Sequence, residues 1–90
     1  MIVKELKPLH DRAKSFYKKA KVQTMQDGTT ELKSYNTIIL KLDNNGNITR
    51  NADTDNYTNT TLRHVKEFLK QFTNLKLETK KQILKNIKEF

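Results

Sequence analysis

The sequence contains no cysteine and no tryptophan, one proline and two glycines. Without cysteine the chain cannot form a disulfide or a thiolate nucleophile, and nearly every zinc motif is excluded. No apolar run approaches the ~18 residues of a membrane-spanning helix, and residues 1–5 lack the cationic start and apolar stretch of a signal peptide. We therefore expect a soluble cytoplasmic protein without a membrane partner.

The 90 residues suffice for one domain, which we expect to span residues 1–90. Hydrophobic residues make up 34% of the chain and charged residues 31%. The core must therefore be small, and a chain of this size buries only roughly 60 to 65% of its unfolded surface.

Positive charge is concentrated at the two ends of the chain. Lys and Arg number 18 against 10 Asp and Glu, which gives a net charge of +8. Residues 1–21 and 58–90 are strongly basic, whereas residues 22–57 are slightly acidic. Clustered cations gain free energy by releasing counterions from phosphates. The pattern favours nucleic acid, or a host complex that processes nucleic acid, as the partner; a solvated lysine surface is the alternative.

Turn signals divide the first part of the chain into short strands. Asp27-Gly28 and Asn45-Gly46 are typical hairpin turns, and the residues between them are rich in apolar and β-branched types. The alternation weakens near Asn36, which indicates a bulge. The sequence predicts a three-stranded antiparallel β-meander over residues 16–50, with residues 1–14 as a frayed N-terminal segment.

Two helices are expected to complete an α+β fold by packing against the meander. The first spans residues 58–72, because apolar residues recur there at helical spacing. The second spans residues 79–89 and opens with a capping-box pattern. On the first helix the spacing places four charged residues on the solvated side, with the first and third at ion-pair spacing: Arg63, Lys66, Glu67 and Lys70.

No residue pattern indicates catalysis, a metal site or a cofactor. His64 lies at the border of the apolar stripe and is expected to bond to a neighbouring strand rather than to act as a base. Asp53 and Asp55 fit a solvated loop better than a metal site, and a hydrolase that uses them with His64 is the weakest hypothesis. We expect a non-enzymatic protein with no small-molecule substrate.

Cations on the first helix are the main candidates for binding a polyanion. Arg63, Lys66 and Lys70 are predicted to contact phosphates, with further lysines beside them if the first strand is adjacent: Lys18, Lys19 and Lys21. Tyrosines offer stacking surfaces for unpaired bases, with core or rim packing as the alternative: Tyr17, Tyr35 and Tyr57.

The order of these segments resembles a family of short uncharacterised proteins of phages and mobile elements in low-GC Gram-positive bacteria. The resemblance covers roughly residues 12–72. Three blocks carry it: Ser15-Phe16-Tyr17-Lys18-Lys19-Ala20, Leu32-Lys33-Ser34-Tyr35-Asn36-Thr37 and Thr60-Thr61-Leu62-Arg63-His64-Val65-Lys66-Glu67-Phe68. It implies a phage accessory protein in the cytoplasm of a bacterial host, and such proteins often act on host machinery.

Two functions are therefore expected. The first is non-enzymatic binding of nucleic acid or a host nucleoprotein through the basic helix face. The second is an anti-defence, anti-CRISPR-type inhibitor that contacts a host enzyme through Tyr35, Tyr57 and the acidic loop of residues 51–57. A homodimer is plausible as well, because the small core leaves a short edge strand near Thr49 unprotected.

Overall fold

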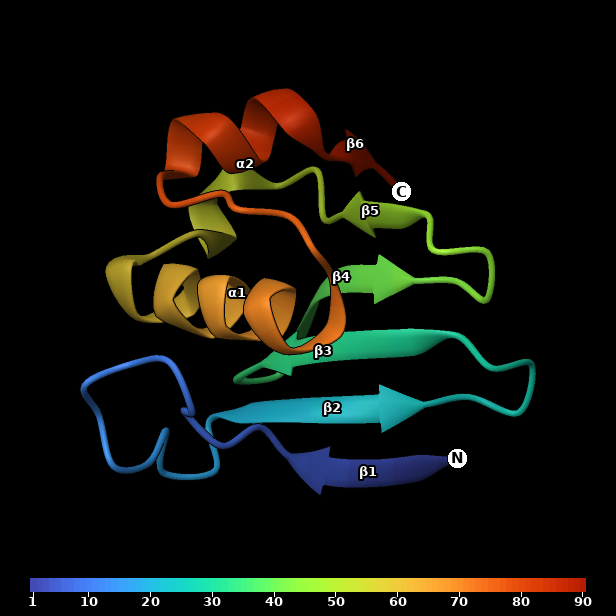
Figure 1. Ribbon diagram of the computed structural model, residues 1–90, viewed down its shortest axis with the longest axis horizontal. Helices are drawn as coiled ribbons and strands as arrows, with labels where there is room; N and C mark the ends of the chain where they lie inside the picture. Colours follow the sequence, from blue (N-terminus) through green and yellow to red (C-terminus); the bar gives the residue numbers. More distant parts are fainter.

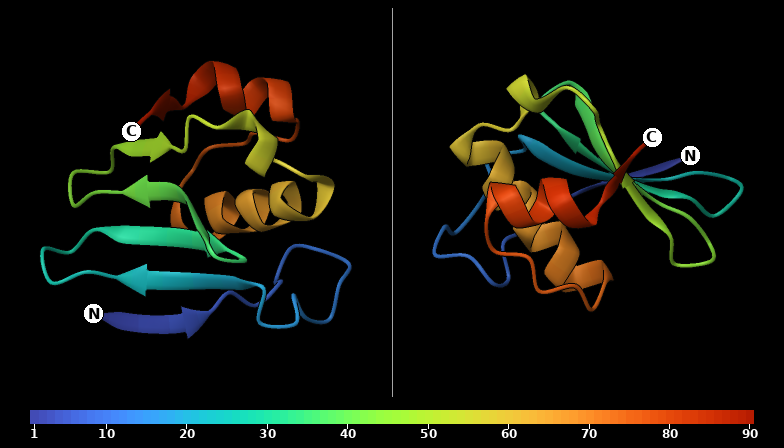
Figure 2. Two further views of the ribbon diagram at one scale, coloured as in Figure 1. Left: turned by 180° about the vertical axis from the view of Figure 1, so that it is seen from behind. Right: turned by 90° about the horizontal axis from the view of Figure 1, so that it is seen from above.

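The computed structural model describes residues 1–90 and shows a six-stranded sheet with both α-helices on the same side (Figures 1 and 2). The strands lie in the order of the sequence. The elements are β1 (Ile2–Glu5), β2 (Ala20–Thr24), β3 (Thr30–Ser34), β4 (Thr37–Leu42), β5 (Ile48–Arg50), the 3₁₀ helix η1 (Thr54–Asn56), α1 (Asn59–Phe72), α2 (Lys80–Asn86) and β6 (Lys88–Glu89).

The α+β class is as predicted, but the three-stranded meander is wrong, because the sheet has six strands and is mixed. Strands β1 to β5 pair antiparallel, and β6 pairs parallel to β5. In place of the bulge predicted near Asn36, the chain turns at Tyr35, whose φ is 55°, and forms a hairpin of β3 and β4. An aromatic residue rarely adopts this left-handed conformation, so the sequence carried no turn signal.

Both ends of the chain join the sheet instead of fraying. Ile2 pairs with Thr24 in the β1–β2 ladder, and Leu6 is 1% exposed in the core. At the other end, helix α2 stops at Asn86, short of the predicted residue 89, and the chain continues into β6. Because β6 covers the edge of β5 at Thr49, that strand is not the unprotected edge expected from the sequence. Strand β1 forms an open edge, and a homodimer stays a prediction.

Helix α1 begins and ends where the apolar spacing predicts. Thr58 caps it, and the Thr58 side chain accepts a hydrogen bond from the backbone N–H of Thr61. Val65, Phe68 and Leu69 are buried against the sheet, whereas Phe72 at the end of the helix is 43% exposed. Neither helix has the length and apolar character needed to cross a membrane.

Candidate nucleic-acid interface

The three cations predicted on α1 are partly neutralised by acidic neighbours. The Arg63 Nε atom lies 3.1 Å from Asp11 Oδ2, and a second guanidinium nitrogen contacts the other carboxylate oxygen. This hydrogen-bonded pair lowers the pKa of Asp11 to about 2, and the nearby charge of Lys66 contributes in the same direction. Lys70 Nζ lies 3.3 Å from Glu78 Oε1. The helix face alone is therefore a weaker polyanion site than the sequence indicated.

Glu67 does not lie on the solvated side, as the helical spacing predicted. It is 2% exposed and accepts hydrogen bonds from the backbone N–H of His10 at 2.7 Å and from Gln71 Nε2 at 2.7 Å. The His10 Nδ1 atom lies 2.8 Å from the second carboxylate oxygen. The predicted Arg63–Glu67 pair is therefore wrong, because each residue binds a group in the segment between β1 and β2.

This segment, residues 7–19, carries five Lys or Arg residues and one acidic residue, and we call it the basic loop. Its contacts with α1 involve Arg63, Glu67 and Gln71, so they hold the loop along the length of the helix. The loop lies beside α1 in Figure 1. Phe16 is 5% exposed and anchors the end of the loop in the core. The sequence predicts fraying here because the groups that hold the loop belong to α1, far along the chain.

Lys18 and Lys19 are exposed at the end of the basic loop and take part in none of the ion pairs of the structure. Tyr17 and Lys18 have φ values of 54° and 61°, so the backbone turns sharply here. Lys19 Nζ lies 5.8 Å from the centre of the Tyr35 ring, a cation–π contact. Lys66 on α1 also takes part in no ion pair, but it is partly buried, so these two lysines are the more accessible unpaired cations beside α1.

Lys21 lies on the other face of the sheet from α1. Its neighbours in β2, Ala20 and Val22, are buried on the helix side, and successive side chains of a strand alternate between faces. Its partner in the ladder is Lys33. The predicted grouping of Lys21 with the helix cations is therefore wrong.

Two of the three tyrosines are available to a ligand. Tyr17 is 79% exposed and Tyr35 is 49% exposed. Tyr57 is 4% exposed, and its hydroxyl donates to the backbone oxygen of Asn51 at 2.7 Å. Its predicted role as a binding residue is therefore wrong, and the packing alternative is confirmed. The inhibitor hypothesis loses one of its two aromatic anchors.

A cavity of about 350 Å³ lies between the basic loop, the β3–β4 turn and the first turns of α1. Its walls bring together two cations and four aromatic or imidazole rings from segments far apart in the sequence. The residues are Lys19, Arg63, Phe16, Tyr17, Tyr35 and His64.

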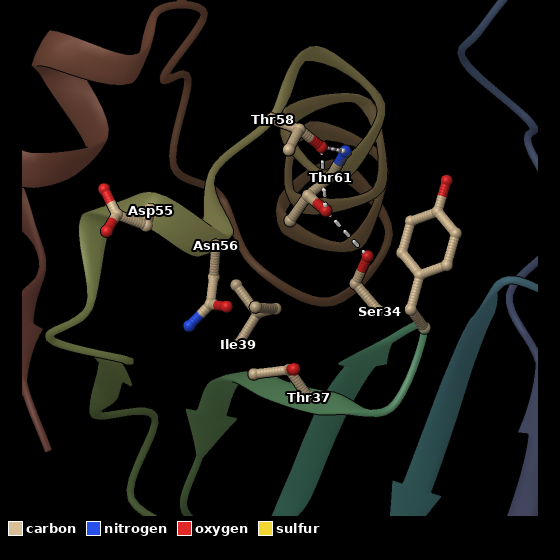
Figure 3. A pocket seen from close by; sticks show the side chains of 8 residues that line it. Ser34, Thr37, Ile39, Asp55, Asn56, Thr58 and Thr61 are labelled. Atoms are coloured by element: carbon tan, nitrogen blue, oxygen red, sulfur yellow. Dashed lines mark hydrogen bonds between the residues drawn. The ribbon is translucent and has the colours of Figure 1, made fainter.

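His64 is fully buried and bonds to a neighbouring strand, as predicted. Its Nδ1 lies 2.9 Å from Ser34 Oγ at the end of β3. The Ser34 hydroxyl lies 2.9 Å from Thr61 Oγ1, which Thr58 Oγ1 contacts at 3.3 Å (Figure 3). These hydroxyls line a second, polar pocket of about 260 Å³.

The acidic loop does not contribute to the His64 site. Asp53 caps η1, where its carboxylate accepts a hydrogen bond from the backbone N–H of Asp55. The hydrogen bonds of the His64 ring involve Ser34 and no carboxylate. The hydrolase hypothesis thus lacks its acid–base pair. No group of three His, Asp or Glu side chains lies close enough together to hold a metal ion.

Burial lowers the pKa of His64 from 6.5 to about 4. Between pH 6.5 and about 4 the His64 imidazole is protonated in the unfolded chain and neutral in the folded protein. The free energy of unfolding therefore decreases as the pH falls through this range. We expect a loss of about 2 kcal/mol between neutral pH and pH ~4.5. Urea denaturation at a series of pH values measures it. The loss should disappear in His64→Gln, and an unchanged pH profile in that variant would contradict this assignment.

Residues 4–86 match the model of DUF8033, a family of unknown function. The chain belongs to DUF8033. In this member the match extends from β1 to the last residue of α2, so it includes the basic loop, both exposed tyrosines and α1. Comparison with curated proteins and with solved structures gives no significant match. The phage or mobile-element origin of this DUF8033 protein stays a prediction.

Proposed function

We propose that the protein binds single-stranded nucleic acid, without catalysis, at the surface formed by the end of the basic loop, the β3–β4 turn and the start of α1. The observation that carries the proposal is the gathering of two exposed tyrosines and Lys19, which has no acidic partner, around one cavity, with the unpaired Lys18 next to Lys19 in the chain. Lysines neutralise phosphates without reading sequence, and aromatic rings stack on unpaired bases.

A single strand fits this surface better than a duplex does. In a duplex the bases stack on each other, so exposed tyrosines find few aromatic faces to contact. The backbone φ values of Tyr17 and Tyr35 are 54° and 55°. Such conformations are uncommon for aromatic residues and cluster at functional positions. The rings are therefore presented at the surface by turns that local backbone preference would not select.

Fluorescence anisotropy with a labelled oligothymidylate tests the proposal. Contacts by Lys18 and Lys19 would give log Kd a slope of about 1.4 against log salt concentration, because each phosphate contact on a single strand contributes about 0.7. The duplex of the same length should bind about tenfold more weakly, since it cannot stack on the tyrosines. Binding that does not change with salt, or tighter binding of the duplex, would contradict the proposal.

A further inference from the structure

One buried side-chain polar atom in the protein has no hydrogen-bond partner, and it is Nε2 of His64. Buried polar groups in native proteins are almost always satisfied, so each exception calls for a physical reason. His64 is also one of the residues that line the cavity between the basic loop and α1. A ligand in that cavity is the simplest partner for the free nitrogen.

The hydroxyl chain beside Nδ1 is the basis for assigning the tautomer of His64. Thr58 Oγ1 accepts a hydrogen bond from the backbone N–H of Thr61 and donates its own proton to Thr61 Oγ1. Ser34 Oγ lies 2.9 Å from both Thr61 Oγ1 and His64 Nδ1. A chain that continues in the direction set by Thr58 has Thr61 donate to Ser34 and Ser34 donate to His64 Nδ1, and we assign this direction here. The contacts among Thr58, Thr61 and Ser34 are drawn in Figure 3. A neutral imidazole that accepts at Nδ1 carries its proton on Nε2, so Nε2 is a hydrogen-bond donor.

The other walls of the cavity suit a flat aromatic ligand. The Phe16 ring meets His64 edge-on with centroids 4.6 Å apart, and the Tyr35 ring centroid lies 6.1 Å from that of His64. Lys19 and Arg63 add positive charge to the cavity. A volume of about 350 Å³ is near the lower end of the ~300–1,000 Å³ typical of small-molecule sites. It matches one nucleotide unit better than a larger group.

We infer that this cavity receives one unpaired nucleobase of the bound strand, whose acceptor atom takes the hydrogen bond of His64 Nε2 while Lys19 contacts a flanking phosphate. The inference rests on the proposed function and specifies that the cavity recognises a base of the strand. His64 has no exposed surface, so the base reaches the nitrogen when a side chain at the cavity mouth turns aside. Tyr35 is the cavity side chain placed to do so, because its ring centroid lies 6.1 Å from that of His64 and it is 49% exposed.

Two probes of equal length and charge distinguish the contribution of the bases to affinity from that of the phosphates. One is a labelled oligothymidylate, and the other is the same strand with abasic sites throughout. We expect the base-bearing strand to bind about tenfold more tightly, which is within the range of one stacked base. The ¹⁵N resonance of His64 Nε2 should shift on addition of the oligothymidylate and stay unchanged with the abasic strand.

A double variant, Tyr17→Asn/Tyr35→Asn, supplies the mutational test. Asparagine tolerates the left-handed backbone at both positions, so the turns are kept while the rings are removed. We expect its affinity for the oligothymidylate to fall to the abasic level. Phe90→Ala is the matched control, because Phe90 is an exposed ring beyond β6 that contacts Lys41 and does not line the cavity. It should bind like the wild type.

The outcomes distinguish this inference from the proposed function. Equal affinity for the two probes would overturn the base site and leave binding of the phosphate backbone in place. A preference for the base-bearing strand without a shift of the His64 resonance would place the base outside the cavity and overturn the inference as well. Failure of both probes to bind would overturn the proposed function itself.

Discussion

Charge reversal at Lys18 and Lys19 is expected to weaken the affinity for single-stranded DNA about a hundredfold, since each lost phosphate contact costs ~1.4 kcal/mol, or tenfold in Kd. Both lysines are exposed and take part in no ion pair, so their full charge is available to phosphates. The slope of log Kd against log salt should also fall by about 1.4. Fluorescence anisotropy of the Lys18→Glu/Lys19→Glu variant over a salt series measures both effects.

A second pair of lysines provides the matched control. Lys81 and Lys85 are exposed on α2, which lies apart from the basic loop (Figure 1). The variant Lys81→Glu/Lys85→Glu changes the net charge by the same amount. We expect it to lose less than about threefold in affinity, because charges farther away than a Debye length of ~8 Å are largely screened. An equal loss in both variants would show that net charge alone drives binding and would contradict the assigned surface.

Replacement of Glu67 with alanine is expected to lower the free energy of unfolding by about 3 kcal/mol, as is usual when one partner of a buried polar pair is removed. Burial raises the pKa of Glu67, but the hydrogen bonds from His10 and Gln71 outweigh it and leave the pKa below its ordinary value. The carboxylate is therefore charged in the folded protein. Its loss would leave the donors of the basic loop without their acceptor. Urea denaturation at neutral pH measures the change.

Glu78 is the control for this substitution, since it is the same residue type at an exposed position. Its carboxylate pairs with Lys70, and its side chain is 56% exposed. Glu78→Ala should change the free energy of unfolding by no more than about 0.5 kcal/mol, as for most surface ion pairs. Limited proteolysis should cut Glu67→Ala first within residues 7–14. Similar stability losses in the two variants, or an uncut basic loop, would contradict the anchoring role of Glu67.

Local signals in the sequence suffice for the elements that depend on near neighbours. The spacing of Val65, Phe68 and Leu69 identifies α1, and the Thr79–Gln82 pattern identifies the start of α2, where the structure has the capping box. Gly28 and Gly46 occupy turns with φ values of 90° and 85°, which glycine adopts without strain. In each case the residues that determine the structure lie within a few positions of one another.

Features that depend on distant residues could not be predicted in this way. Glu67 falls on the polar side of an isolated helix, and only the approach of His10, 57 residues away, buries it. Strand β6 has two residues and owes its position to contacts such as Arg50 Nε with the Ile87 carbonyl at 2.9 Å. The turn at Tyr35 is supported by a hydrogen bond from its backbone N–H to the Lys19 carbonyl.

The same limit applies to the candidate site. Helical spacing placed Arg63 on a solvated face, but it could not show that Asp11 neutralises it. Tyr17 and Tyr57 both lie beside polar residues, yet one is exposed and the other is buried, because Tyr57 follows η1 into the core. His64 was recognised as a residue bonded to a strand, whereas its free nitrogen depends on which groups surround it in three dimensions.

The anchoring of the basic loop by α1 has a consequence for the order of folding. Contacts between residues 57 positions apart form only after the intervening chain has collapsed, because closing a long loop costs conformational entropy. The loop should therefore be the last part to become ordered and the first to open in hydrogen exchange. A nascent or damaged chain would then lack the proposed binding surface, so that capture of a nucleic acid strand, if that is what the surface binds, would require a completed core.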